Sequence, residues 1–221
     1  KDVSQKTDSQ LVAEATRDNL DIAIDLKGYT DGSRSHIFSQ RIAPVQINFL
    51  GYPSTMGADF IDYIIADKIL IPNRAQKYYK EKIIYMPFSY QPNDALRHIP
   101  DSSISREDLG LDAENFIFCN FNQNYKILPK EFSIWMTLLR KVPDSILWLF
   151  RSNSHAEENL KREALERDIN PERLLFADFT NNSKHLDRLQ HADLFLDNFI
   201  VTGHTTTSDA LWAGVPVITK L

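Results

Sequence analysis

Short apolar runs alternate with segments of helical periodicity along residues 113–221. The runs FIFCNF and SILWLF carry apolar side chains at successive positions, which is typical of strands that are buried on both faces of a parallel sheet. Between the runs, apolar residues recur at helical spacing, and Phe132, Trp135 and Met136 form one such stripe after Pro129. The pattern predicts strands at 116–121, 145–150, 174–177, 194–196 and 215–219, and helices at 129–141, 156–167, 184–191 and 208–214.

The first half of the chain follows the same alternation less regularly. The strand candidate VQINFL runs into a loop with two glycines, and an earlier candidate, DIAIDL, runs into the loop KGYT. A polar stretch with prolines, residues 91–112, shows no sustained period and is expected to contain the linker between the halves. The pattern predicts a helix at 9–19 and strands at 21–26, 45–50, 62–66 and 82–86.

Together these patterns predict an α/β fold with parallel sheets covered by helices. We expect a first half at residues 1–95, a linker at 96–112 and a second half at 113–221. The chain starts with Lys1 rather than Met and ends directly after a strand. It is therefore expected to be a piece of a longer two-domain protein, with both lobes truncated.

Composition narrows the class of protein. The chain has 221 residues, of which 43% are hydrophobic and 25% charged, as in ordinary globular proteins. Its net charge of −5 disfavours a nucleic-acid partner, which would require clustered Lys and Arg. Cys119 is the only cysteine, which fits a reducing, cytoplasmic compartment. The sequence contains neither an apolar run long enough for a membrane span nor a metal-ligand motif, so we expect no membrane partner and no metal.

A loop rich in Gly, His and Thr is the most informative candidate site. It lies between the buried run ADLFLD and the helical segment SDALWAG. The free N–H groups and the positive end of a helix favour a phosphate at such a position, and Thr205 and Thr206 could add hydroxyl donors. The alternative is that these threonines simply cap the helix. His204 belongs to the same loop.

Other candidates follow the predicted strands. Gln123 and Lys126 come after the strand at 116–121, where a lysine can neutralise a phosphate; a solvated loop lysine is the alternative. His185 could stack on a base or be structural, and Arg188, one helical turn later, could equally form a surface salt bridge. Asp209 could accept hydrogen bonds from ribose hydroxyls or be an exposed carboxylate.

Seven collinear motifs resemble the catalytic region of the O-linked N-acetylglucosamine transferase and SPINDLY-like family. The resemblance extends from about Asp21 to Leu221 and implies a GT-B fold, which has two Rossmann-like lobes with the donor between them. Residues 1–95 would then be the C-terminal part of the N-terminal catalytic lobe, and residues 113–221 the first part of the C-terminal nucleotide-binding lobe. The motifs are DLKGYT at 25–30, RIAPVQ at 41–46, LGYP at 50–53, DYIIAD at 62–67, FNQNYK at 121–126, GHTT at 203–206 and ALWAGVP at 210–216.

The resemblance also implies roles for matching positions. Those near the diphosphate and sugar are Gln123, Lys126, Tyr125, His204, Thr205 and Thr206. His185 would stack on uracil with Arg188 nearby, and Asp209 would hold the ribose. From the first lobe, Leu50, Gly51 and Pro53 would line the sugar pocket.

Two features depart from the family pattern. Animal members carry a lysine three residues before the stacking histidine, where this chain has Asn182, and this puts the ribose contacts in question. The short linker leaves no room for the domain that animal members insert between the lobes, which favours a bacterial-type member. The family's tetratricopeptide repeats and upstream histidines would precede Lys1.

The resemblance implies an inverting, metal-independent transferase that moves N-acetylglucosamine from UDP-GlcNAc to Ser or Thr of a protein, although this piece alone is expected to be inactive. One alternative is fucose transfer from GDP-fucose, as in SPINDLY-like members. A second is a nucleotide-sugar sensor without turnover. A UDP-sugar 2-epimerase, which shares the architecture, ranks last because of the motifs at 121–126 and 203–206.

Overall fold

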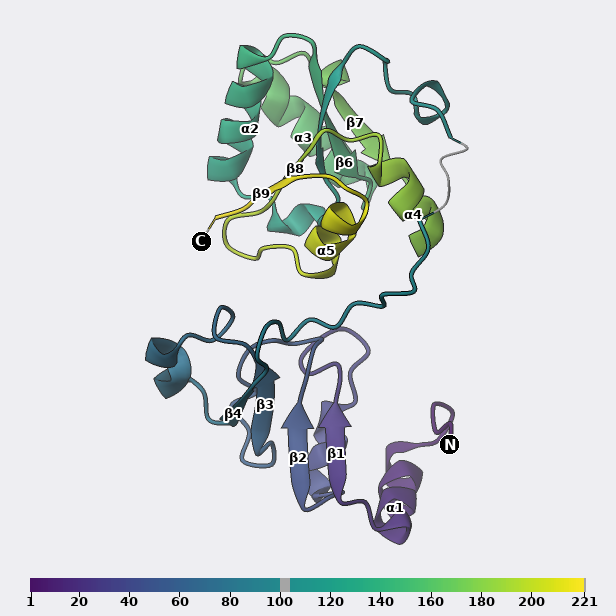
Figure 1. The fold of residues 1–221 in the computed structure, drawn as a ribbon, viewed down its shortest axis with the longest axis vertical. Helices are drawn as coiled ribbons and strands as arrows, with labels where there is room; N and C mark the ends of the chain where they lie inside the picture. Colours follow the sequence, from purple (N-terminus) through teal and green to yellow (C-terminus); the bar gives the residue numbers. More distant parts are fainter. Residues whose placement is uncertain (100–103, 221) are drawn as a thin grey trace. The chain divides into compact units, whose positions relative to one another are not determined.

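The computed structural model describes residues 1–99 and 104–220 of the chain. The chain divides into two compact units, Lys1–Pro92 and Asn93–Leu221 (Figure 1). Each unit contains its own parallel sheet. The units are therefore described separately.

Unit 1 contains a four-stranded parallel sheet. The strands are β1 (Ile22–Asp25), β2 (Val45–Asn48), β3 (Tyr63–Ala66) and β4 (Lys82–Tyr85), in the order β1-β2-β3-β4. Helix α1 (Asp8–Asp18) precedes the sheet. It begins with a capping box in which Thr7 and Gln10 exchange hydrogen bonds, so the first free N–H groups of the helix are satisfied.

The loop after β2 lies against the loop after β1. The backbone N–H of Gly51 donates to the carbonyl oxygen of Leu26 at 3.1 Å. A Cβ atom at Gly51 would lie 2.4 Å from that same oxygen, so only glycine fits this close approach. The preceding Leu50 has a φ of 74°, a left-handed conformation that is costly for a leucine. Backbone strain is therefore concentrated at the carboxyl end of β2.

Unit 2 contains a five-stranded parallel sheet in the order β7-β6-β5-β8-β9 (Figure 1). Four α-helices accompany it. The strands are β5 (Phe116–Asn120), β6 (Ser145–Phe150), β7 (Leu174–Ala177), β8 (Leu194–Leu196) and β9 (Val217–Ile218), and the helices are α2 (Pro129–Lys141), α3 (Ser154–Leu165), α4 (Asn182–Leu189) and α5 (Thr205–Trp212).

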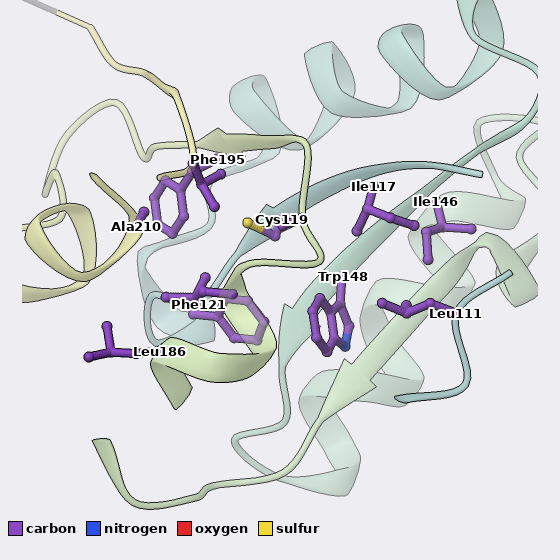
Figure 2. Close-up of a cluster of buried hydrophobic side chains, with 12 residues drawn as sticks. Leu111, Ile117, Cys119, Phe121, Ile146, Trp148, Leu186, Phe195 and Ala210 are labelled. Carbon is purple, nitrogen blue, oxygen red and sulfur yellow. The ribbon is translucent and has the colours of Figure 1, made fainter. Parts of the chain in front are cut away.

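Successive side chains of the central strands enter different cores on the two faces of this sheet. Ile146 and Trp148 of β6 pack in the core that includes Leu186 of α4 and Ala210 of α5 (Figure 2). Leu147, between them, packs in the other core, with residues of α2 and α3. Burial on both faces explains why these strands read as continuous apolar runs.

The predicted α/β fold with parallel sheets is confirmed. Every predicted strand corresponds to an observed one within a few residues, but α5 begins at Thr205 rather than at 208 and α4 at Asn182 rather than at 184. The sequence pattern did not predict the short 3-10 helices η1 (Ser35–Gln40), η2 (Asn73–Tyr78), η3 (Glu107–Leu109), η4 (Asn124–Lys126) and η5 (Pro171–Arg173). Such short turns carry too few residues for a recognisable period.

The segment expected as a linker, 96–112, lies in unit 2 where it is described, and residues 100–103 lie outside the described part. Leu111 is buried in the core beside β5. Arg106 donates to the carbonyl oxygen of His191 and to Asp193.

Among the helices of the described ranges, none is long and apolar enough to cross a membrane.

We expect Gly51→Ala to destabilise unit 1 by more than about 2 kcal/mol, because its Cβ would meet backbone atoms that cannot move independently. Gly57→Ala is the matched control: its Cβ would meet nothing within 4 Å, but its φ of 61° is unfavourable for alanine. That variant should lose only about 1 kcal/mol. Urea unfolding followed by circular dichroism measures both losses, and equal losses would contradict the close-approach argument.

Candidate functional site

A pocket of about 340 Å³ lies beyond the carboxyl ends of β5, β6 and β7 in unit 2. Ligands of open α/β sheets bind at this edge. Part of its wall comes from the loop between β7 and α4, and part from the helices α4 and α5. It is lined by Phe121, Gln123, Phe150, Phe179, Thr180, Asn181, Asn182, His185, Arg188, Thr206 and Asp209.

His185 and Arg188 form one side of this pocket together with Phe121. The His185 ring meets the Phe121 ring edge-to-face, with the centroids 5.1 Å apart. The Arg188 guanidinium lies 4.7 Å from the centroid of the Phe121 ring. Its Nε donates to His185 Nδ1 at 3.1 Å and its Nη1 to the carbonyl oxygen of Asp178 at 2.6 Å. The imidazole is therefore held in one orientation.

The same packing keeps His185 uncharged at neutral pH. Burial and, secondarily, the positive charge of Arg188 lower the pKa of His185 to about 4. Because Nδ1 accepts from Arg188, the ring proton is on Nε2. Burial also lowers the pKa of Arg188 to about 10, so the guanidinium stays protonated at neutral pH. A neutral, fixed imidazole beside an aromatic ring is suited to stacking on a flat base.

Asp209 lies on α5 at another wall of the pocket and is only 4% exposed. Its Oδ1 forms an ion pair with Arg97 Nη1. Its Oδ2 accepts a long hydrogen bond, 3.5 Å, from Asn182 Nδ2. The carboxylate therefore already has protein partners on both oxygens.

The threonines at the start of α5 do not cap it through their side chains. The N-cap residue is His204, and it makes no side-chain capping hydrogen bond. The hydroxyl of Thr206 instead donates to Asn122 Oδ1 at 2.5 Å, which joins α5 to the turn after β5. A Cβ at Gly203 would lie 2.5 Å from the hydroxyl oxygens of Thr206 and Thr207, so glycine is required for this packing. Thr205 is exposed at the first position of the helix.

Lys126 lies in the 3-10 helix η4 and is partly buried. Burial lowers the pKa of its ammonium group, and the negative charge of Asp197 opposes that shift. His204 is near enough for the charge of Lys126 to help burial lower the pKa of His204, while Asp197 acts in the opposite direction. Lys126, His204 and Asp197 therefore form one electrostatic group at the end of β8.

The structure brings five predicted site residues into one pocket. They are Gln123, His185, Arg188, Thr206 and Asp209. Tyr125 is 79% exposed and borders a neighbouring pocket, which Gln123 also lines. In unit 1, Leu50, Gly51 and Pro53 follow β2, where the structure shows backbone strain and close packing within that unit.

Sequence reasoning missed two residues of this region. Arg97 is 112 positions away from its partner Asp209 along the chain, so no local sequence pattern predicts the pair. Asp197 ends the apolar run ADLFLD, and a carboxylate that closes such a buried run indicates a paired charge. Residues 1–99 and 104–220 contain no cluster of three or more His, Cys, Asp or Glu side chains that could hold a metal ion.

The chain is similar to known proteins over almost all of its length. The model of glycosyl transferase family 41 matches residues 2–104 and 97–221. The chain is 37% identical, over 99% of its length, to a probable UDP-N-acetylglucosamine–peptide N-acetylglucosaminyltransferase SEC of Arabidopsis thaliana, and it covers 23% of that protein. It is 29% identical, over 98% of its length, to a probable UDP-N-acetylglucosamine–peptide N-acetylglucosaminyltransferase SPINDLY of Solanum lycopersicum, again covering 23%. The chain thus spans about a quarter of these relatives.

A solved structure matches the fold of the whole chain. It is a mutant of the Thermobaculum terrenum O-GlcNAc transferase, with a TM-score of 0.83 and 28% identity over 99% of this chain and 41% of that one. This match confirms the GT-B fold expected from the sequence.

We expect the His185 ring to stay uncharged well below neutral pH, with a pKa near the value of about 4 given above. The unfolded chain takes up a proton near the ordinary value of 6.5, so folding stability is fully present above that pH and falls as the pH drops from 6.5 towards 4. Between about pH 7 and about pH 5 the loss from this group is on the order of 1–2 kcal/mol.

Nuclear magnetic resonance titration of the ring measures this pKa directly. His185→Gln provides the control, because its unfolding free energy should depend less on pH across that interval. A His185 ring that titrates near 6.5 would contradict the described environment.

Proposed function

This chain belongs to glycosyl transferase family 41, and on that premise we propose that it supplies the donor-binding part of a protein O-glycosyltransferase. The proposed reaction moves N-acetylglucosamine from UDP-GlcNAc to a Ser or Thr hydroxyl of a protein acceptor. One observation carries the proposal: neutral His185, Asp209 and Thr206 share a pocket at the carboxyl edge of a parallel sheet. Both relatives described above carry names of UDP-GlcNAc–peptide transferases.

In this proposal the pocket binds the nucleoside. Uracil would stack on the imidazole of His185, and Arg188 would hold that ring in place through its hydrogen bond to Nδ1. Phe179 and Asn182 line the same pocket, and backbone groups around them would contact the edge of the base. Asp209 lines the same pocket and would accept hydrogen bonds from the ribose.

The diphosphate would lie towards the start of α5 and Lys126. Free N–H groups and the positive dipole end of α5 attract a phosphate, and Lys126 adds a full positive charge. Such preorganised charge stabilises a departing diphosphate without moving in the transition state. This proposed mechanism is inverting and needs no metal.

The sugar end of the donor is assigned through the family resemblance. Tyr125, Gln123 and His204 would contact the sugar or its phosphate from unit 2, and Thr205 would donate from the first turn of α5. The residues assigned in unit 1 are Leu50, Gly51 and Pro53. A strained leucine directly before an obligatory glycine is typical of a functional loop, and this supports the assignment in unit 1.

Two other functions are compatible with the same pocket. Phe179 is 84% exposed and lines the pocket where a base would lie. The part of the pocket that would distinguish uracil from guanine is therefore open to solvent. GDP-fucose is for this reason the alternative donor. A nucleotide-sugar sensor without turnover would use the pocket in the same way. The names of both relatives favour transfer of N-acetylglucosamine from UDP-GlcNAc.

Calorimetry with UDP, UDP-GlcNAc, GDP and GDP-fucose tests the donor class. We expect the chain to bind the uridine nucleotides at least about tenfold more tightly than the guanosine nucleotides, because a pocket built for one base leaves polar groups of the other unpaired. The reverse preference would establish the GDP-fucose alternative. Donor binding without transfer to any peptide of a broad panel, in the longest native chain that contains these 221 residues, would favour the sensor.

Lys126→Ala tests the phosphate end of the site. In the longest native chain that contains these residues, we expect the variant to lose about 10²- to 10³-fold in kcat, equivalent to about 3–4 kcal/mol of transition-state stabilisation. The matched control is Lys130→Ala, since Lys130 is an exposed lysine four residues later, on α2. That control should change kcat by less than about twofold. Near-normal turnover by Lys126→Ala, with the fold intact, would refute the role of Lys126.

A further inference from the structure

Asp209 presents an electrostatic problem for the proposed nucleotide pocket. Its side chain is almost fully buried and lines the pocket that would receive a nucleoside diphosphate. A buried carboxylate is costly unless it is paired, and an unpaired one near a diphosphate would repel it. The pocket can therefore hold such a ligand only if another group compensates the charge of Asp209.

Arg97 supplies that compensation from a distant part of the sequence. Its Nη1 is ion-paired with Asp209 Oδ1, and the two residues are 112 positions apart. Both side chains are largely shielded from water, with exposed fractions of 19% for Arg97 and 6% for Asp209. Screening is weak in such a place, so the pair acts more strongly than a surface salt bridge.

Trp212, a second residue of α5, also contacts Arg97. The Arg97 guanidinium carbon lies 5.1 Å from the ring centroid of Trp212. The indole Nε1 of Trp212 donates to the backbone carbonyl oxygen of Arg97 at 3.1 Å. Both the side chain and the backbone of Arg97 are therefore fixed against α5, and the ion pair has one geometry.

The pairing also determines how Asp209 faces the pocket. Oδ1 is taken by Arg97, whereas Oδ2 has only the long contact with Asn182, which itself lines the pocket. A carboxylate oxygen accepts more than one hydrogen bond. Oδ2 therefore keeps accepting capacity on the side of the pocket where a ribose hydroxyl would lie.

We propose that Arg97 is a positioning residue of the nucleotide pocket, which neutralises Asp209 and orients its Oδ2 so that the pocket accepts a nucleoside diphosphate. The inference rests on the proposed function. Arg97 itself does not line the pocket, so it acts through Asp209. A residue that only held the fold together would affect all ligands alike, whereas a charge-balancing residue affects ligands in proportion to their negative charge.

Calorimetry of the full chain with uridine, UMP and UDP separates these roles. In Arg97→Gln, we expect UDP affinity to fall at least about tenfold and uridine affinity by less than about threefold, with UMP between them. Arg97→Lys keeps the charge and should retain UDP affinity within about fivefold. Thermal unfolding of each variant verifies that it is folded.

A double variant provides the sharpest control. Asp209→Asn combined with Arg97→Gln removes both charges and preserves the shapes of the side chains. We expect the double variant to restore the ratio of UDP affinity to uridine affinity found in the unmodified chain, because the changed ribose contact is common to both ligands and no unpaired carboxylate remains. Should Arg97→Gln fail to fold, the charge-free double variant takes its place. It is expected to lose affinity for uridine and for UDP by the same factor, within about threefold, because the changed ribose contact of Asp209 is common to both ligands.

The outcomes distinguish this inference from the proposed function. Equal losses for uridine and UDP in Arg97→Gln, or a folded double variant that does not restore the ratio of UDP affinity to uridine affinity, would overturn the role of Arg97 and leave the nucleotide site intact. If the unmodified chain bound neither uridine nor UDP, the proposed function itself would fail, and the role of Arg97 with it.

Discussion

Burial of the Asp197 carboxylate is the constraint on which the candidate site depends. Asp197 closes β8, is 2% exposed and accepts four hydrogen bonds. A buried carboxylate persists only when such donors compensate its lost hydration. Its donors come from three parts of unit 2: Oδ1 accepts from Asn122 Nδ2, Asn198 N and Gly203 N, and Oδ2 from the hydroxyl of Thr219. One charge thus ties together the turn after β5, the end of β9 and the loop that begins α5.

A second buried carboxylate completes this arrangement. Glu131 of α2 is fully buried and accepts hydrogen bonds from Asn198 Nδ2 and the backbone N–H of Phe199. The loop between β8 and α5 is therefore fixed at its first residues by Glu131 and at Gly203 by Asp197. Residues between these anchors are free to be exposed, as Ile200 and Val201 are. The anchors place the start of α5, and with it Thr206 and Asp209, beside the turn after β5.

The sequence predicted the parts of this architecture that local patterns encode. Residues 146–150 are apolar at every position because β6 is covered on both faces, and such runs predict strands for that reason. The predicted start of α5, residue 208, is wrong by three residues, because successive threonines favour a loop over a helix. In the structure, the hydroxyl of Thr206 finds its partner in Asn122, 84 residues away. The pairing of Arg97 with Asp209 is likewise non-local, and no spacing along the chain could predict it.

The positively charged side chains of this region differ in whether they already have partners in the protein. The guanidinium of Arg188 already donates to His185 Nδ1 and to a backbone carbonyl, and that of Arg97 is bound to Asp209. Both cations therefore have partners within the protein, although Nε and Nη2 of Arg97 are buried without a hydrogen-bond partner among the described residues. In the proposed site, Lys126 and the N-terminus of α5 would supply the positive charge for a phosphate. Because Lys126 is partly buried, its charge acts in surroundings less polar than water. Burial alone would favour loss of that proton, and the neighbouring Asp197 opposes this loss. The carboxylate that fixes the loop thus also helps to keep the nearby lysine charged.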